Sequence, residues 1–271
     1  MPDDLLLADL PPHRIWARGG DRPVLALHCS LAHSGAWIGL AERLTGITLT
    51  ATDQIGHGRA ADWDGVSDLH ASATASSIAM AERLGQGRPI DLMGHSFGGT
   101  VALRVALTRP DLVRSLTLVE PVVFAAARGT PVYDRFRTRH LDFARLILSG
   151  QREQALRVFH GDWGNGETLE TMSERMRTYL FDRIHLIEGQ NPVLLDDAAG
   201  LLRPGVIEGI RVPVLLVDGA KSPPIIEAVH SALIRRLTLV QRLTVPGAGH
   251  MVSITHADAV APVVQEHLDG C

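Results

Sequence analysis

The feature that most constrains the fold is an alternation between short apolar runs of strand type and longer runs with helical spacing. The alternation fills the chain up to residue 120 and returns after residue 210. Apolar strands between helices are typical of a mostly parallel α/β sheet that helices cover on both faces. The first twenty residues are expected to add an antiparallel edge hairpin. The expected strands are 23–30, 46–53, 89–95, 113–121, 211–219 and 239–247, and the expected helices are 34–44, 68–85, 97–109, 223–237 and one from about residue 257.

Between residues 121 and 210 the strand-type runs stop. Helix-like segments follow one another there, and glycines predict breaks at Gly150, Gly161 to Gly166 and Gly189. A helical block inserted between strands of one sheet predicts a cap rather than a separate domain. We therefore assign residues 1–120 and 211–271 to the sheet core and residues 121–210 to a helical cap.

Composition narrows the classes of partner. The 271 residues carry a net charge of −4, which favours neither nucleic acid nor an anionic membrane surface. No run approaches the ~18 apolar residues of a membrane span, and the acidic N-terminal segment does not resemble a signal peptide. Two cysteines, Cys29 and Cys271, do not predict a disulfide framework. We expect a cytoplasmic protein with a small-molecule partner, and the sequence leaves its oligomeric state open.

The segment Gly94-His95-Ser96-Phe97-Gly98 matches the pattern G-x-S-x-G, with a predicted strand before it and a predicted helix after it. A sharp turn between strand and helix needs flanking residues that are nearly free of side chain. The helix N-terminus also directs N–H groups and partial positive charge at an anion formed near Ser96. The other interpretation is a tight turn whose serine only caps the helix. The strand and helix on either side favour a nucleophile.

A serine nucleophile needs a base, and His250 is the best placed of the 13 histidines. It follows the last predicted strand in the glycine-rich segment VPGAGHMV, so the loop can return its ring to the strand ends. The other interpretation is an ordinary histidine of a surface loop.

Four stretches, LALHCSLAHSGAW, TDQIGHGRA, MGHSFGG and VPGAGHM, resemble the α/β-hydrolase fold superfamily in their content and order. The resemblance implies a serine hydrolase with a helical cap. It also implies an oxyanion hole made by the backbone N–H groups of Ser30 and Phe97, with Leu31 as the alternative to Ser30. Asp53 and His57 resemble residues that support the loop near the site.

The chain departs from this family at two positions. Cys29 stands where the family often has glycine, and Ser222 stands where the family usually has the acid of its catalytic triad. Three carboxylates could replace that acid: Glu120, Asp218 and Glu227. We predict Glu120, because it ends the strand expected beside the strand of Ser96. A Ser–His dyad without an acid is the remaining alternative.

The predicted function is hydrolysis of a small, mostly apolar ester, lactone or thioester through an acyl-enzyme, with Ser96, His250 and Glu120 as the triad. Amide or C–C bond cleavage uses the same groups. Other classes on this fold are cofactor-free oxygenases, perhydrolases and non-catalytic binders of small molecules. No cofactor or metal is expected, because the sequence shows no metal-ligand spacing or phosphate-binding loop. Residues expected to line the substrate pocket are Trp37, Trp63, Phe124, Tyr133, Trp163 and Met251.

Overall fold

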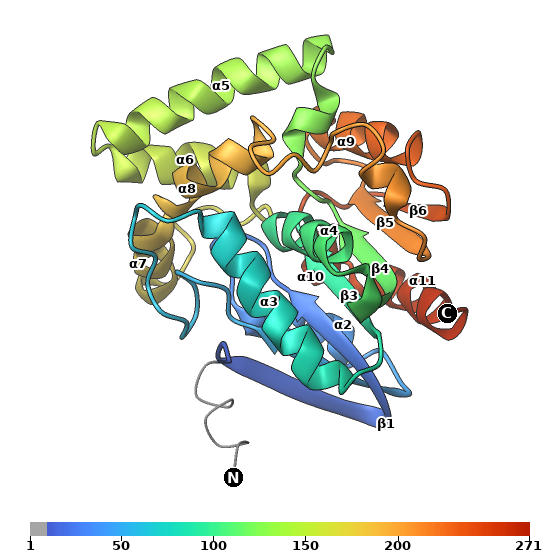
Figure 1. Ribbon diagram of the computed structural model, residues 1–271. Coiled ribbons are helices and arrows are strands. Elements are labelled where there is room, and N and C mark those ends of the chain that lie inside the picture. Colours follow the sequence, from blue (N-terminus) through green and yellow to red (C-terminus); the bar gives the residue numbers. More distant parts are fainter. Residues whose placement is uncertain (1–9) are drawn as a thin grey trace.

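The computed structural model describes residues 10–271 and contains a six-stranded sheet with the order β2-β1-β3-β4-β5-β6 (Figure 1). From β1 the chain steps out to β2 and then returns to place β3 on the other side of β1. Loops that leave neighbouring strands at such a switch point diverge and leave room for a site. The strands are β1 His13–Leu27, β2 Ile47–Thr52, β3 Ile90–His95, β4 Val113–Val119, β5 Val214–Gly219 and β6 Val240–Val245.

Strand β1 has two arms that both pair with β2. Residues 22–27 run in the same direction as β2, whereas residues 13–19 meet β2 in reverse order, with His13 opposite Thr52 and Arg18 opposite Ile47. The second pairing makes residues 13–19 an antiparallel edge strand beside β2, and no hairpin lies within residues 10–20, where part of one is expected from the sequence. Residues 1–9 of that expected hairpin lie outside the described residues.

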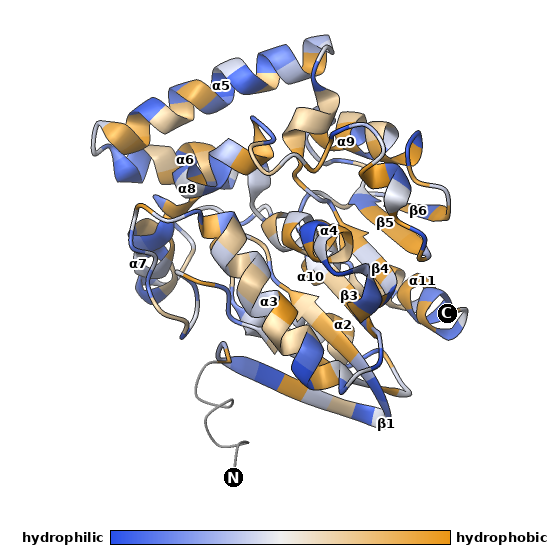
Figure 2. Cartoon of the chain, in the orientation of Figure 1, coloured by the Kyte–Doolittle hydropathy of each residue, from blue (hydrophilic) through white to orange (hydrophobic). Residues whose placement is uncertain are grey.

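Helices cover both faces of the sheet, and the strands divide their side chains between two apolar clusters. Leu92 faces the cluster under α3, α4 and α9, while the next residue, Met93, faces the cluster under α2 and α11. This alternation follows from the two-residue period of a strand, and apolar residues dominate the central strands in Figure 2. The helices are α2 Ile38–Ala41, α3 Leu69–Gly85, α4 Phe97–Thr108, α9 Pro224–Ile234, α10 Val252–Thr255 and α11 Ala257–Asp269, with short 3-10 turns at Ser34–Trp37, Pro110–Leu112, Phe124–Ala127 and Ile207–Gly209.

The helices between β4 and β5 gather near one end of the strands in Figure 1. They are α5 Pro131–Leu148, α6 Arg152–Trp163, α7 Glu174–Arg183 and α8 Leu186–Leu194. They share an apolar cluster that includes Phe143, Leu156 and Ile187, and Leu31 from the loop after β1 joins it. The segment therefore packs against the end of the sheet where β1 and β3 terminate.

The prediction of a helix break at Gly189 was wrong, because Gly189 lies inside α8. A Cβ at this position would stand 2.6 Å from the ring of Trp63, so the missing side chain admits an indole against the helix. The expected break at Gly150 is present, just after α5 and with a φ of +77°. Helix α7 begins at Glu174, where the side chain of Ser173 caps it.

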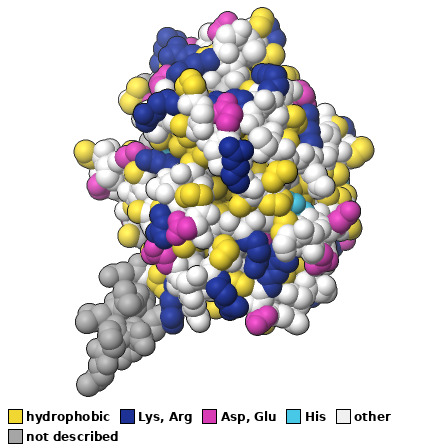
Figure 3. Space-filling model, turned by 45° about the vertical axis from the view of Figure 1, so that its right-hand side comes forward, with side chains coloured by type: hydrophobic (Ala, Val, Ile, Leu, Met, Phe, Trp, Pro, Cys, Tyr) yellow, Lys and Arg dark blue, Asp and Glu magenta, His cyan; other side chains and the backbone are white. Residues whose placement is uncertain are grey.

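Figure 3 shows a face of the molecule on which apolar side chains reach the surface among basic and acidic ones. Within residues 10–271, no helix combines the length and the apolar character that crossing a bilayer requires.

Candidate active site

Ser96 lies between the end of β3 and the start of α4, in a conformation that few residues adopt. Its φ is 56° and its ψ is −117°, and its N–H donates to Val119 O at 2.8 Å. Its side chain makes no capping hydrogen bond to α4. Strained backbone of this kind is concentrated at functional sites. The geometry therefore gives no support to a serine that only caps the helix.

The glycines on either side of Ser96 allow two backbone segments to come very close. A Cβ at Gly94 would lie 2.2 Å from Gly98 O, and a Cβ at Gly98 would lie 2.3 Å from Leu27 O. Any side chain at either position would push α4 away from β3 or from the end of β1. The pattern G-x-S-x-G is thus a packing requirement of this turn.

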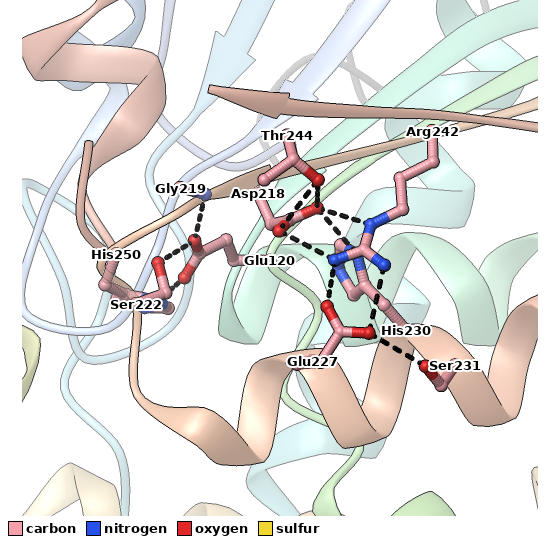
Figure 4. A network of polar contacts seen from close by, with 10 residues as sticks. All are labelled: Glu120, Asp218, Gly219, Ser222, Glu227, His230, Ser231, Arg242, Thr244 and His250. Carbon is pink, nitrogen blue, oxygen red and sulfur yellow. Dashed lines mark hydrogen bonds and ion pairs between the residues drawn. The ribbon is translucent and has the colours of Figure 1, made fainter. Parts of the chain in front are cut away.

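The ring of His250 meets the carboxylate of Glu120 (Figure 4). His250 Nδ1 donates a hydrogen bond to Glu120 Oε2, although 130 residues separate the two in the chain. Glu120 directly follows β4, has a φ of +46° and is fully buried, and His250 is 4% exposed. The structure therefore brings His250 to the carboxylate that the sequence favours as its partner.

The other oxygen of Glu120 accepts two further hydrogen bonds. Gly219 N–H donates to Glu120 Oε1 at 2.8 Å, and the Ser222 hydroxyl donates to the same oxygen. Burial is the strongest single influence and would raise the pKa of Glu120. The charge of His250 and these hydrogen bonds together outweigh it, so the pKa of Glu120 is held below its ordinary value. Glu120 is thus an anion that fixes the His250 ring with Nε2 on the side away from the carboxylate.

His95 ties the turn of Ser96 to the loop of His250. Its Nε2 donates to His250 O at 2.9 Å, and the centroids of the two rings are 5.1 Å apart. Burial lowers the pKa of His95 to about 3, so it is neutral at ordinary pH. The sequence analysis missed this role. The variable position of G-x-S-x-G gives no signal for it beyond the presence of a polar residue in a buried turn.

The two other candidate acids are engaged elsewhere (Figure 4). Asp218 accepts from Arg242 at 2.8 and 2.9 Å and lies 3.2 Å from His230 Nδ1. Although burial opposes it, hydrogen bonds and charge from Arg242 and His230 lower the pKa of Asp218 to about 2. Glu227 pairs with Arg242 and accepts from Ser231 at 2.9 Å. Neither carboxylate contacts His250 in the part of the chain that the structure describes.

The backbone groups expected to form an oxyanion hole come from neighbouring loops. Phe97 is the first residue of α4, so its N–H has no acceptor within the helix. Ser30 follows β1, whose last residue, Leu27, reaches the turn at Gly98, and Leu31 has a φ of +62°. The Ser30 hydroxyl donates to Gln190 Oε1 of α8 at 2.8 Å, a contact that the sequence analysis missed.

Cys29 lies beside this loop and is buried. Burial raises the pKa of Cys29 to about 12, which keeps it a thiol at neutral pH. A protonated thiol is a poor nucleophile, so Cys29 fits a packing role.

Asp53 and His57 lie in the loop after β2, and their side chains form hydrogen bonds with backbone groups. Asp53 accepts from Ser34 N at 2.7 Å and from Arg59 N at 3.0 Å, while His57 Nδ1 bonds to Ile55 O. These contacts join the loops after β1 and β2. They match the supporting role expected from the sequence.

A mostly apolar cavity of about 310 Å³ opens beside Ser30 and Leu31. Its other walls come from α6, α7 and the segment after His250. A second cavity of about 560 Å³, which His250 itself lines, shares His160, Gly164 and Met251 with the first. Prominent apolar lining residues of the first cavity are Leu156, Phe159, Trp163, Met172, Met176 and Met251.

The residues expected to line the pocket divide into two groups. Trp163 and Met251 line the apolar cavity. Trp37 lies in the core cluster under α2 and α11, and Trp63 packs against Gly189. Phe124 and Tyr133 lie in the cluster on the other face, where the Tyr133 hydroxyl donates to Leu195 O at 3.0 Å.

A family model described as "Alpha/beta hydrolase family" matches residues 24–263. The chain belongs to the alpha/beta hydrolase family. A putative alpha/beta hydrolase from Nostoc sp PCC 7120 has the same fold, with a TM-score of 0.73, 22% identity and 97% of each chain covered.

Curated relatives of this alpha/beta hydrolase include a lipase and an esterase. Lipase LipV of Mycobacterium tuberculosis is 40% identical over 121 residues, which cover 44% of each chain. A pimeloyl-[acyl-carrier protein] methyl ester esterase of Neisseria meningitidis is 30% identical over 233 residues, or 82% of this chain and 68% of that protein. The matched stretches thus span less than half of LipV and about two thirds of the esterase.

Proposed function

We propose that this alpha/beta hydrolase cleaves a small, mostly apolar carboxylic ester through a serine acyl-enzyme. The observation that carries the proposal is the hydrogen bond from His250 Nδ1 to the buried carboxylate of Glu120, next to the strained turn of Ser96. A base oriented by a carboxylate, beside a serine at a helix N-terminus, is the arrangement that activates a hydroxyl. The names of the curated relatives, a lipase and a methyl ester esterase, agree with an ester as substrate.

In the first half of the reaction, Ser96 Oγ attacks the carbonyl carbon of the ester while His250 Nε2 takes its proton. The carbonyl oxygen becomes an anion and accepts hydrogen bonds from the N–H groups of Ser30 and Phe97. The C–O bond to the alcohol then breaks, and His250 gives its proton to the leaving alkoxide. Glu120 stays ionised throughout and stabilises the imidazolium.

In the second half, water replaces the alcohol. His250 Nε2 takes a proton from water, and the resulting hydroxide oxygen attacks the acyl carbon. The bond from that carbon to Ser96 Oγ breaks, and the proton on His250 returns to Ser96. The carboxylic acid leaves, and its own proton is lost to solvent at neutral pH.

Residues 121–210 form a cap in this proposal, with the apolar cavity between α6, α7 and the loop of Ser30 as the site for the apolar part of the ester. The lining is dominated by apolar side chains, and such cavities bind ligands mainly through burial of apolar surface. Three of the lining residues are methionines, whose flexible side chains adapt to chains of different shape.

Fluorophosphonate labelling tests the nucleophile directly. The native protein should incorporate one phosphonyl group on Ser96 and hydrolyse p-nitrophenyl esters, and Ser96→Ala should lose both properties. Ser76→Ala on α3, whose hydroxyl bonds only within its helix, is the matched control and should keep both. Absence of labelling at Ser96 together with absence of ester turnover would refute the proposal. Oxygen uptake without ester turnover would place the protein among the oxygenases instead.

A further inference from the structure

Ser222 contacts the carboxylate that holds His250. Its half-buried side chain donates to Glu120 Oε1, the oxygen that also accepts from Gly219 N–H. In Figure 4 Ser222, Glu120 and His250 form one connected chain of hydrogen bonds. By resemblance, position 222 is where the family usually has its acid.

We propose that Ser222 is a positioning residue of this site, which orients Glu120 so that Glu120 in turn orients His250. The inference rests on the proposed function, because it assigns a role for Ser222 within the Ser96–His250–Glu120 triad. Ser222 touches neither substrate nor His250 in this role.

The loop that carries Ser222 is fixed to the loop that carries His250. Ala220 N–H donates to Val245 O at 3.0 Å, Lys221 N–H donates to Ala248 O at 2.8 Å, and Ser222 N–H closes a turn onto Gly219 O at 3.0 Å. The two loops touch so closely that a Cβ at Gly219 would lie 2.4 Å from Ala248 O. These backbone contacts therefore position Ser222 independently of its hydrogen bond to Glu120.

The contact matters because Glu120 is buried and anionic. A buried carboxylate must have its oxygens satisfied by donors, and hydrogen bonds to a charged group are stronger than those between neutral groups. Oε2 is engaged by His250, so the rotation of the carboxylate is set by the donors on Oε1. Removing the hydroxyl leaves Gly219 as the sole described donor on Oε1 and lets the carboxylate turn away from His250.

A pair of matched variants separates the hydroxyl from the shape of the side chain. Ser222→Thr retains the hydroxyl, and Ser222→Val has nearly the same shape without it. We expect Ser222→Val to lower kcat by about tenfold with KM unchanged, as the loss of one hydrogen bond to a charged group implies. Ser222→Thr should restore most of kcat. Ser231→Ala on α9, whose hydroxyl bonds to Glu227 instead, is the control and should match the native protein.

The decisive measurement repeats Ser222→Val in a Glu120→Gln background. If Ser222 acts through Glu120, the second substitution has almost no further effect on kcat, because the charge that it serves is gone. An equal tenfold loss in both backgrounds, or equal kcat for the Thr and Val variants, would overturn the inference. Full activity of Glu120→Gln alone would instead refute the triad of the proposed function, so the two failures are distinguishable.

Discussion

The indole of Trp163 stands edge-on to the imidazole of His250, with the ring centroids 4.7 Å apart and an angle of 76° between the ring planes. Trp163 is the last residue of α6, and it also lines the apolar cavity beside Ser30. One side chain thus forms a wall common to His250 and to the cavity. An apolar chain bound in the cavity would have the end nearest Trp163 close to His250.

This geometry predicts that a larger side chain in the cavity lowers kcat/KM for esters with a long acyl chain more than for short ones. Met176 on α7 lines the cavity and is 44% exposed, so Met176→Trp adds volume there without disturbing the buried core. We expect kcat/KM for p-nitrophenyl octanoate to fall by about tenfold, the cost of losing one to two buried methylenes of contact. The acetate ester, which does not reach the cavity, should react at nearly the native rate.

Phe181 provides the control for this experiment. It lies on the same helix, is 39% exposed and does not line the apolar cavity. Phe181→Trp should leave both esters unaffected. If Met176→Trp slows acetate and octanoate equally, the cavity does not hold the apolar part of the substrate.

The contacts of Glu120 predict that an acid at position 222 can replace Glu120 as the partner of His250. Glu120→Gln should lower kcat by ~10³- to 10⁴-fold, because a neutral amide neither stabilises the imidazolium nor fixes the required tautomer of His250. The Ser222 hydroxyl reaches the carboxylate that holds His250, and an aspartate side chain at position 222 is one bond longer than that of serine. The double variant Glu120→Gln/Ser222→Asp should recover at least about tenfold of the lost kcat.

Steady-state kinetics on folded protein check this prediction, with Glu120→Gln/Ser231→Asp as the control. Ser231 lies in the neighbouring network and bonds to Glu227, so an aspartate there should give no recovery. Equal activity of the two double variants would show that position 222 cannot serve His250.

Most of the architecture could be predicted from local pattern. The apolar strands and the glycines around Ser96 follow from periodicity and from backbone packing that needs glycine. The expected placing of the Glu120 strand beside the Ser96 strand is confirmed by the strand order. The contact between His250 and Glu120 is present, while the catalytic roles of these residues stay predictions.

What could not be predicted depends on side chains that meet across long sequence separations. The helix does not break at Gly189, because the missing side chain makes room for the ring of Trp63. Trp63 lies in a loop that is distant in the sequence. The hydrogen bonds of His95 to His250 and of Ser222 to Glu120 likewise join positions more than 100 residues apart. The sequence around a single serine or histidine does not indicate which distant residue its side chain will contact.

Four buried histidines predict that the free energy of unfolding begins to fall near pH 6.5 as the pH is lowered, well before carboxylates titrate. Burial penalises the charged imidazole and lowers the pKa values of His28, His70 and His95 to about 3 and that of His57 to about 4. In the unfolded chain these rings bind protons near pH 6.5, so between pH 6.5 and 4 the unfolded state holds more protons than the folded state. Stability must then rise with pH across this window.

Urea unfolding at pH 7.5, 6.5 and 5.5 measures this effect. We expect the free energy of unfolding to fall as the pH drops, with a slope approaching ~1.4 kcal/mol per pH unit for each such histidine well below pH 6.5. His70→Asn should reduce the slope by about one proton, because it removes one of the four rings. A free energy that stays constant from pH 7.5 to 5.5 would contradict the neutral, buried state of these rings.

The ion pair of Asp218 with Arg242 predicts a second pH-dependent contribution, which acts at lower pH. Asp218→Asn leaves Arg242 without its main partner, and we expect the free energy of unfolding at pH 7 to fall by ~2 kcal/mol. This cost is smaller than that of breaking a fully buried pair, because the Arg242 side chain is 24% exposed and still meets Glu227. Asp142→Asn on α5 is the control, since its pair with Arg145 is exposed and should contribute little.

The sign of the pH dependence follows from the lowered pKa of Asp218. Its value is about 2 in the folded protein against 3.8 for the free side chain, so its stabilising contribution is complete above pH 3.8 and is lost as the pH falls toward 2. The difference in free energy of unfolding between the native protein and Asp218→Asn should therefore shrink from pH 5 to pH 3. Urea unfolding at pH 7, 5 and 3 gives this difference directly. A difference that remains constant down to pH 3 would mean that Arg242 does not hold Asp218 in its ionised form.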